Sequence, residues 1–129
     1  MNALKAIQYA TMQPVRRKLL EKDVQKQCVD WARARGYWAR KFSSQSQRSV
    51  PDYLFSVHGV NDSVYRTKIK FACEFKRPGC KINKVTGVMS TEAQVEEQEA
   101  MRLAGWFVFE CDNFARFRTV VYAYENEQV

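Results

Sequence analysis

One acidic side chain interrupts a segment that otherwise has the composition of a buried β-strand. Residues 64–75 are rich in β-branched and aromatic side chains, and the segment ends in Phe71-Ala72-Cys73-Glu74-Phe75. This composition predicts a strand in which Glu74 is at least partly buried. A buried carboxylate without a partner is costly unless a metal or another cation compensates for its charge. We therefore expect the fold to place positive charge beside Glu74.

Two further charged residues can meet Glu74 at one edge of a sheet. Residues i and i+2 of a strand point to the same face, so Glu74 and Lys76 share a face and Phe75 lies on the other. Asp52, preceded by Val50-Pro51, begins the predicted strand upstream. Two carboxylates and a lysine in this arrangement can hold Mg²⁺ or Mn²⁺ against a phosphodiester. The alternative is an exposed salt-bridge ladder, because Glu-x-Lys alternation is common on solvated strands.

The remaining patterns predict an α/β fold with the element order α-β-β-β-α-β-α. Pro14 suits the first turn of a helix and Gly36 the residue after its end, and the apolar residues between them recur at helical spacing. Thr91 and Gln94 predict a capping box at the start of a second helix. The other elements are expected as strands over residues 37–42, 53–57 and 106–109, a helix to about residue 103, and a last helix after the cap Asp112-Asn113.

The length of 129 residues fits one domain. We expect an arm over residues 1–13, the domain over residues 14–125 and a tail over residues 126–129. No run approaches the ~18 apolar residues of a membrane span, and the N-terminus lacks the pattern of a signal peptide. We therefore expect a cytoplasmic protein without a membrane partner. The apolar face of residues 114–124 suits the core better than a dimer surface.

The net charge of +7 is unevenly distributed along the chain. Residues 1–91 contain 18 Lys and Arg against 6 Asp and Glu, a net of +12, whereas residues 92–129 contain 3 against 8, a net of −5. A basic body suits a polyanionic partner, although it also suits a surface that only maintains solubility. The four cysteines form no CxxC pair and there is one histidine, which disfavours structural zinc. Cys28 and Cys73 are expected to be buried thiols.

Two helices contribute further candidates to the same site. Glu21 lies beside the apolar stripe of the first helix, where it either points along the sheet towards a metal or makes an exposed contact with Gln25. Helical geometry favours the contact with Gln25. Gln94 lies in the first turn of the second long helix, whose N-terminus favours anions such as phosphate. Without this context, Gln94 and Gln98 would be interpreted as exposed polar residues.

Together these segments resemble the VRR-NUC family of the PD-(D/E)XK nuclease superfamily, over roughly residues 17–122. The order and spacing of the segments are more specific than any one of them. Ser49 stands where the family often has glycine, and the loop over residues 77–89, which carries Lys and Arg, is less typical of the family. The segments that carry the resemblance are Leu19-Leu20-Glu21-Lys22-Asp23-Val24-Gln25, Arg48-Ser49-Val50-Pro51-Asp52, Ala72-Cys73-Glu74-Phe75-Lys76, Ser90-Thr91-Glu92-Ala93-Gln94 and Leu103-Ala104-Gly105.

The resemblance implies a core built around a central mixed four-stranded sheet and a role for each candidate residue. Asp52 and Glu74 would be the ligands of Mg²⁺ or Mn²⁺, and Glu21 would be a further carboxylate at the metal. Lys76 would be the base that orients water, and Gln94 would lie near the site. These roles are those of a metal-dependent DNA endonuclease.

Compact stand-alone members of the family resemble Holliday-junction resolvases of bacteria and phages. We therefore expect branched DNA, above all a four-way junction, as the substrate, and a homodimer that supplies two symmetric cuts. The alternatives are a non-catalytic DNA-binding module, a nuclease subunit of a larger repair or restriction complex, and a structural protein with an accidental motif. The candidate phosphate contacts are Arg48, Arg77, Lys81 and Lys84.

Overall fold

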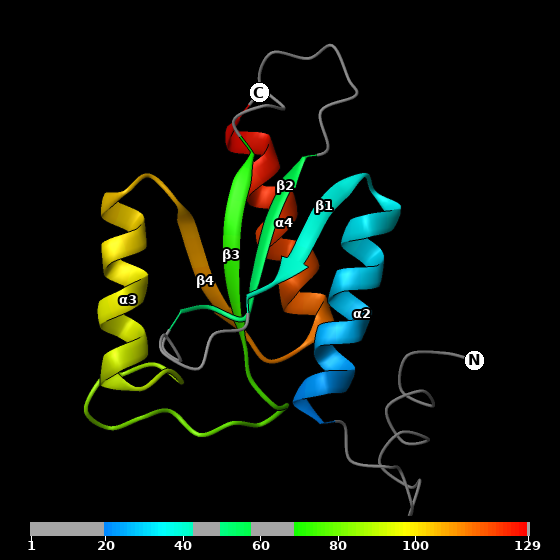
Figure 1. Cartoon of the computed structure of the whole chain (residues 1–129). Coiled ribbons are helices and arrows are strands. Elements are labelled where there is room, and N and C mark those ends of the chain that lie inside the picture. The colour runs from blue at the N-terminus through cyan, green and yellow to red at the C-terminus, as the bar shows by residue number, and fades with distance from the viewer. Residues whose placement is uncertain (1–19, 43–49, 58–68, 129) are drawn as a thin grey trace, which may run out of the picture.

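Three helices and four strands make up the part of the chain that the computed structural model describes, which comprises residues 20–42, 50–57 and 69–128 (Figure 1). Their order, α-β-β-β-α-β-α, is the predicted one. None of the described helices is both long and apolar enough to cross a lipid bilayer. The elements are α2 (Glu21–Ala34), β1 (Tyr37–Lys41), β2 (Tyr53–Val57), β3 (Lys70–Phe75), α3 (Glu92–Leu103), β4 (Phe107–Cys111) and α4 (Phe114–Glu127).

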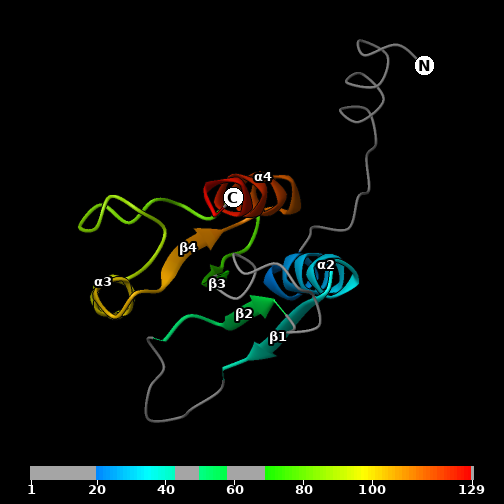
Figure 2. The same cartoon turned by 90° about the horizontal axis from the view of Figure 1, so that it is seen from above.

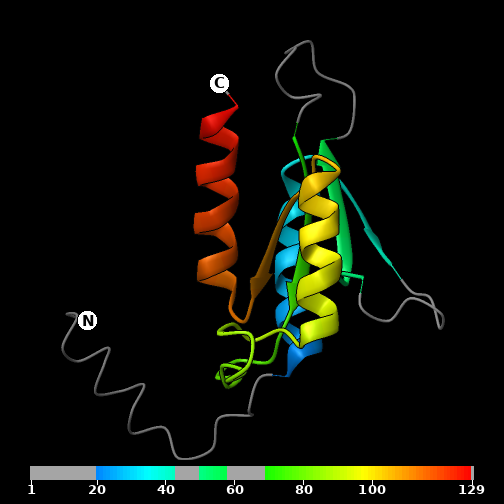
Figure 3. The same cartoon turned by 90° about the vertical axis from the view of Figure 1, so that its left-hand side faces the viewer.

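The strands form one mixed sheet in the order β1-β2-β3-β4. β1 pairs antiparallel with β2 and β2 antiparallel with β3, whereas β3 and β4 are parallel. The parallel pair requires a crossover connection, and α3 lies within it. α2 and α4 cover one face of the sheet and α3 lies on the other side, next to β4 (Figure 2). Figure 3 shows α4 and α3 separated by the sheet. The predicted mixed sheet is confirmed.

An aromatic cluster fills the layer between the sheet and the helices α2 and α4. Phe71 and Phe75 of β3 contact Phe117 of α4, with ring centroids 6.2 and 5.9 Å apart. Phe55 of β2 stacks on Phe71 with a centroid distance of 4.7 Å, and all four rings are fully buried. Because side chains alternate along a strand, this packing turns Glu74 towards the opposite face, where α3 lies.

The first described helix begins later than the sequence pattern predicts. Residues 14–19 lie outside the described residues, and Leu20 has an extended backbone with φ −97° and ψ 163°. The Leu20 backbone N–H donates to Asp23 Oδ2 over 2.8 Å. A carboxylate in the first turn also interacts favourably with the helix dipole. The cap made by Asp23 therefore explains why α2 starts at Glu21.

The predicted strands have small boundary errors. β3 begins at Lys70 within the described residues, and residues 64–68 lie outside them. β4 runs from Phe107 to Cys111, later and longer than predicted, because its pairing with β3 continues to the register Phe75↔Cys111. These extra residues of β4 include Glu110.

Burial settles two predictions about apolar side chains. Phe117 and Val121 of α4 are fully buried against the sheet and α2, so the apolar face of this helix belongs to the core. Cys28 and Cys73 are also fully buried and form no disulfide, as expected of structural thiols.

The aromatic cluster predicts where the fold is most sensitive to truncation. Phe117→Ala should lower the free energy of unfolding by about 3–5 kcal/mol, because it leaves a cavity among the buried rings. Leu103→Ala is the matched control, since this side chain at the end of α3 is 92% exposed. Its effect should stay within about 0.5 kcal/mol. Denaturant unfolding measures both, and equal losses would contradict the assignment of Phe117 to the core.

Candidate active site

The predicted site residues lie at the edge of the sheet where β3 ends. The antiparallel register pairs Tyr53 with Cys73, so Asp52, which precedes β2, lies beside Glu74. The Phe75 backbone N–H donates to Asp52 Oδ2 over 2.8 Å. The N-terminal ends of α2 and α3 lie at this same edge (Figure 1). Sheet pairing and helix placement thus bring together segments that are far apart in the sequence.

Glu74 is buried, with 4% of its surface exposed, and its partners lie on the α3 side of the sheet. Lys76 Nζ lies 3.8 Å from Glu74 Oε1. Gln94 bridges the two charges, because its Nε2 donates to Glu74 Oε1 over 2.9 Å and its Oε1 accepts from Lys76 Nζ over 2.9 Å. The arrangement is therefore not an exposed salt-bridge ladder, and the expected positive charge beside Glu74 is Lys76.

The capping box of α3 fixes the orientation of the Gln94 amide. The Thr91 backbone N–H donates to Gln94 Oε1 over 2.9 Å, and the Gln94 backbone N–H donates to Thr91 Oγ1 over 3.3 Å. Since Oε1 accepts from both Thr91 and Lys76, the amide nitrogen must face Glu74. The predicted capping box is confirmed, and it also orders the polar groups of the site.

Glu21 makes the predicted contact within its helix and is also influenced by the charges of the site. It accepts a long hydrogen bond of 3.4 Å from Gln25 Nε2, which is the expected contact within the helix. Burial raises the pKa of Glu21, and the negative charge of Asp52 raises it further, whereas Lys76 opposes the change. The side chain therefore interacts electrostatically with the site as well as with its helix.

The three carboxylates crowd negative charge into a poorly solvated space. Burial raises the pKa of Glu74 to about 8; the negative charges of Asp52 and Glu21 add to the increase, and Lys76 opposes it. Burial also raises the pKa of Asp52, against the hydrogen bond from Phe75 and the charge of Lys76. Perturbed carboxylates that meet in this way are typical of functional sites.

The carboxylates of the site suit a divalent ion that is held partly by water and substrate. Within residues 20–42, 50–57 and 69–128, no three His, Cys, Asp or Glu side chains are grouped closely enough to hold an ion by themselves. Mg²⁺, however, is commonly held by one or two carboxylates together with water and substrate phosphate. Asp52 and Glu74 meet this requirement, and a bound cation would offset the burial that raises both pKa values and the carboxylate repulsion that adds to the increase for Glu74. The residues fit such an ion, with Glu21 close by.

The structure describes three of the four residues predicted to contact phosphate. Arg77, Lys81 and Lys84 are exposed on the segment that leads from β3 to α3, which starts at the site and passes along the same end of the sheet (Figure 1). Arg48 lies outside the described residues. The exposed cations therefore sit where a bound polyanion could reach both them and the carboxylates.

The sequence interpretation missed a second cation near the carboxylates. Lys41, the last residue of β1, lowers the pKa values of both Asp52 and Glu21. Its position follows from the register of the β1–β2 pair, in which Lys41 lies opposite Tyr53. Only the knowledge that β1 and β2 are paired neighbours, which a single sequence does not provide, would have identified it.

A buried network behind the site was also missed. Glu110, which lies beside Glu74 in the β3–β4 register, accepts hydrogen bonds from Met89 N, Ser90 N and Ser90 Oγ over 2.8, 2.9 and 2.7 Å. Gln98 donates to Ser90 Oγ over 3.0 Å and is 4% exposed. The interpretation of Gln98 as an exposed residue is therefore wrong. This network ties the start of α3 to the sheet and so holds Gln94 in place.

No protein-family model matches this chain, and no curated protein matches it either. Function is therefore inferred from the side chains at this edge of the sheet. The geometry brings Asp52, Glu74, Lys76 and Gln94 together and places Glu21 within electrostatic reach.

The raised pKa of Glu74 predicts that stability falls as the pH rises. Between the ordinary pKa of 4.5 and the folded-state pKa of about 8, the unfolded chain loses a proton that the folded protein keeps. The free energy of unfolding should therefore decrease across this range, by roughly 3 kcal/mol. Denaturant unfolding at pH 5 and pH 8 without divalent ions measures the change.

Glu74→Gln is the control for this pH dependence, because the amide imitates the protonated acid. This variant should keep the stability of the wild type at pH 5 and lose most of the decrease towards pH 8. A wild type whose stability is constant or rises over this interval would show that Glu74 is ionised in the folded protein.

Proposed function

We propose that this protein is a metal-dependent endonuclease that cuts branched DNA. The observation that carries the proposal is the convergence of Asp52, buried Glu74 and Lys76 at the end of β3, with Gln94 bridging Glu74 and Lys76. The resemblance to the VRR-NUC family supports the same assignment, because it gives these residues the roles of metal ligands, base and neighbouring glutamine. The exposed cations of the adjoining segment supply contacts for a phosphate backbone.

Asp52 and Glu74 would hold Mg²⁺ or Mn²⁺, with Glu21 as a further carboxylate. When bound, the ion would polarise the scissile phosphate and lower the pKa of a water molecule. Lys76, fixed by Gln94, is placed to orient that water or to stabilise the negative charge that develops on the phosphate. The helix N-termini of α2 and α3 at this edge also favour an anionic substrate.

Branched DNA is the proposed substrate because the compact stand-alone members of the resembled family are similar to Holliday-junction resolvases. In the part of the chain that the structure describes, every element belongs to the sheet or to the helices that cover it. Two cuts in a four-way junction require two active sites related by symmetry, which a homodimer provides. We propose this dimer as the working form in the cytoplasm.

A non-catalytic DNA-binding module is the second candidate. It is favoured by the finding that the described carboxylates do not form a group of three ligands around one point. In that case Lys76 and Gln94 would only neutralise and hydrogen-bond a buried glutamate. Cleavage assays separate the two candidates.

The principal prediction is metal-dependent cutting of a labelled four-way junction. We expect paired cuts with Mg²⁺ or Mn²⁺ and none with EDTA, and much slower cutting of a linear duplex of the same sequence. Asp52→Ala should lower the cutting rate at least 100-fold while DNA binding in EDTA persists. Asp30→Ala is the matched control, since Asp30 lies on the exposed side of α2 and should cut at the wild-type rate.

Each result of this assay decides between the candidates. Binding of the junction without cutting in any divalent ion would support the second candidate, a non-catalytic DNA-binding module, and contradict the endonuclease. Equal cutting of junction and linear duplex would remove the preference for branched DNA. An Asp52→Ala protein as active as the wild type would show that Asp52 is not a ligand.

The bridge made by Gln94 predicts a separation of activity from stability. Gln94→Ala and Thr91→Ala both weaken the cap of α3, so each should lower the free energy of unfolding by about 1 kcal/mol. Only Gln94→Ala releases Lys76 and Glu74, and it should lower the single-turnover cutting rate roughly 10- to 100-fold. Equal rates for the two variants would show that Gln94 acts only as a cap.

A further inference from the structure

The segment between β3 and α3 exposes aliphatic side chains that the proposed chemistry does not use. Ile82 is 59% exposed and Val85 is 74% exposed. Lys81 and Lys84 are exposed beside them. Two aliphatic side chains and two cations therefore share the short stretch of residues 81–85, which we call the basic loop.

Hydrogen bonds within the segment hold the basic loop in one conformation. Asn83 Oδ1 accepts from Val85 N over 2.9 Å, and Asn83 O accepts from Gly87 N over 2.8 Å. Asn83 N donates to Val88 O over 2.7 Å. Glu110 anchors the end of the segment to β4, next to Glu74. The exposed side chains are thus presented from a preorganised support that is tied to the active site.

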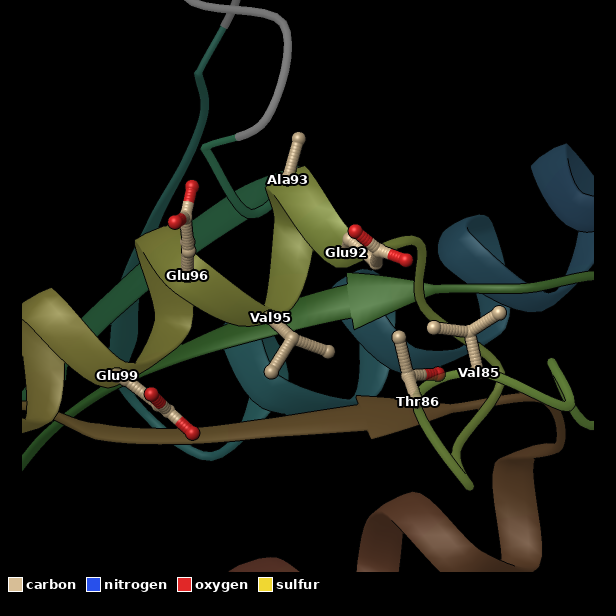
Figure 4. Close-up of a pocket in the computed structure, with 7 residues that line it drawn as sticks. All are labelled: Val85, Thr86, Glu92, Ala93, Val95, Glu96 and Glu99. Carbon is tan, nitrogen blue, oxygen red and sulfur yellow. The ribbon is translucent and has the colours of Figure 1, made fainter.

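Acidic side chains of α3 lie across a pocket from one end of the basic loop. Val85 and Thr86 line a pocket of about 570 Å³ whose other wall is α3, with Glu92, Glu96 and Glu99 (Figure 4). A phosphate backbone is repelled from this acidic wall, whereas an uncharged base is not. Carboxylates can also accept hydrogen bonds from the amino groups of bases. The pocket has the size of small-molecule sites, so it can admit a single base.

We infer that the basic loop packs Ile82 and Val85 against unstacked bases at a DNA branch point, while Lys81 and Lys84 contact the flanking phosphates. Aliphatic side chains that enter a base stack act as wedges in other DNA-binding proteins. Base pairs at the centre of an open four-way junction lack a stacking neighbour on one side, whereas a linear duplex must first be unstacked at a cost of a few kcal/mol. This inference rests on the proposed function, which supplies the DNA substrate. It gives the protein a structural basis for selecting branched DNA.

The experiment uses a four-way junction that carries the fluorescent base 2-aminopurine next to the branch point, in EDTA so that no cutting occurs. Fluorescence of this base rises when it leaves the stack. Saturating wild-type protein should raise the signal, and the double variant Ile82→Ala and Val85→Ala should abolish most of this rise. The same variant should bind the junction about fivefold more weakly.

Two control proteins separate the wedge from other effects. Leu103→Ala removes an aliphatic side chain that is even more exposed, at the far end of α3, and should behave as the wild type. The double variant Lys81→Ala and Lys84→Ala should bind more weakly with a smaller dependence on salt, yet should give the full fluorescence rise at saturation. Thermal unfolding of all variants should match the wild type, because the four loop side chains are exposed.

The outcomes for the wedge and for the nuclease are distinguishable. A full fluorescence rise with the Ile82 and Val85 double variant, or no rise with saturating wild type, overturns the wedge even if the protein cuts DNA. A rise that depends on Ile82 and Val85 supports the wedge even if no divalent ion produces cutting. Failure to bind the junction at all overturns both.

Discussion

The burial of Glu74 is the constraint on which the rest of the site depends. Phe71, Cys73 and Phe75 must face the aromatic core beneath α2 and α4, so alternation along β3 forces Glu74 into the space under α3. A carboxylate there is tolerated only with hydrogen bonds, a nearby cation or a proton. The structure supplies the first two through Gln94 and Lys76, and the raised pKa shows that they do not fully compensate for the buried charge.

Gln94 links the stabilisation of the buried Glu74 carboxylate to the start of α3. Its amide is shared between the cap of the helix and the bridge from Glu74 to Lys76, so the geometry of the helix start determines the geometry of the site. Glu110 reinforces the link by binding the backbone of residues 89 and 90 from the neighbouring strand. Glu74 of β3 and Glu110 of β4 are neighbours in register but have different roles. Glu74 belongs to the site, whereas Glu110 holds the start of α3 against the sheet.

Much of this arrangement could be predicted from the sequence because local patterns specify it. The shared face of Glu74 and Lys76 followed from strand alternation, the place of Asp52 beside them was expected from the family resemblance, and the cap of α3 followed from Thr91 and Gln94. Lys41, Glu110 and the burial of Gln98 could not be predicted in the same way, since they depend on strand register and on how one loop folds over β4. Register requires knowledge of which strands are neighbours, and a single sequence does not provide it.

The basic and acidic parts of the sequence lie on different surfaces of the fold. Cations lie at the end of β1 and on the basic loop, whereas the exposed glutamates of α3 form one wall of the pocket beside that loop. In the proposed complex, a DNA backbone at Glu74 would be attracted along the end of β1 and the loop and repelled from the outer side of α3. On this proposal the acidic helix would act as a boundary, and a branch that places phosphates on one side and bases on the other would satisfy both signs of charge better than a continuous duplex does.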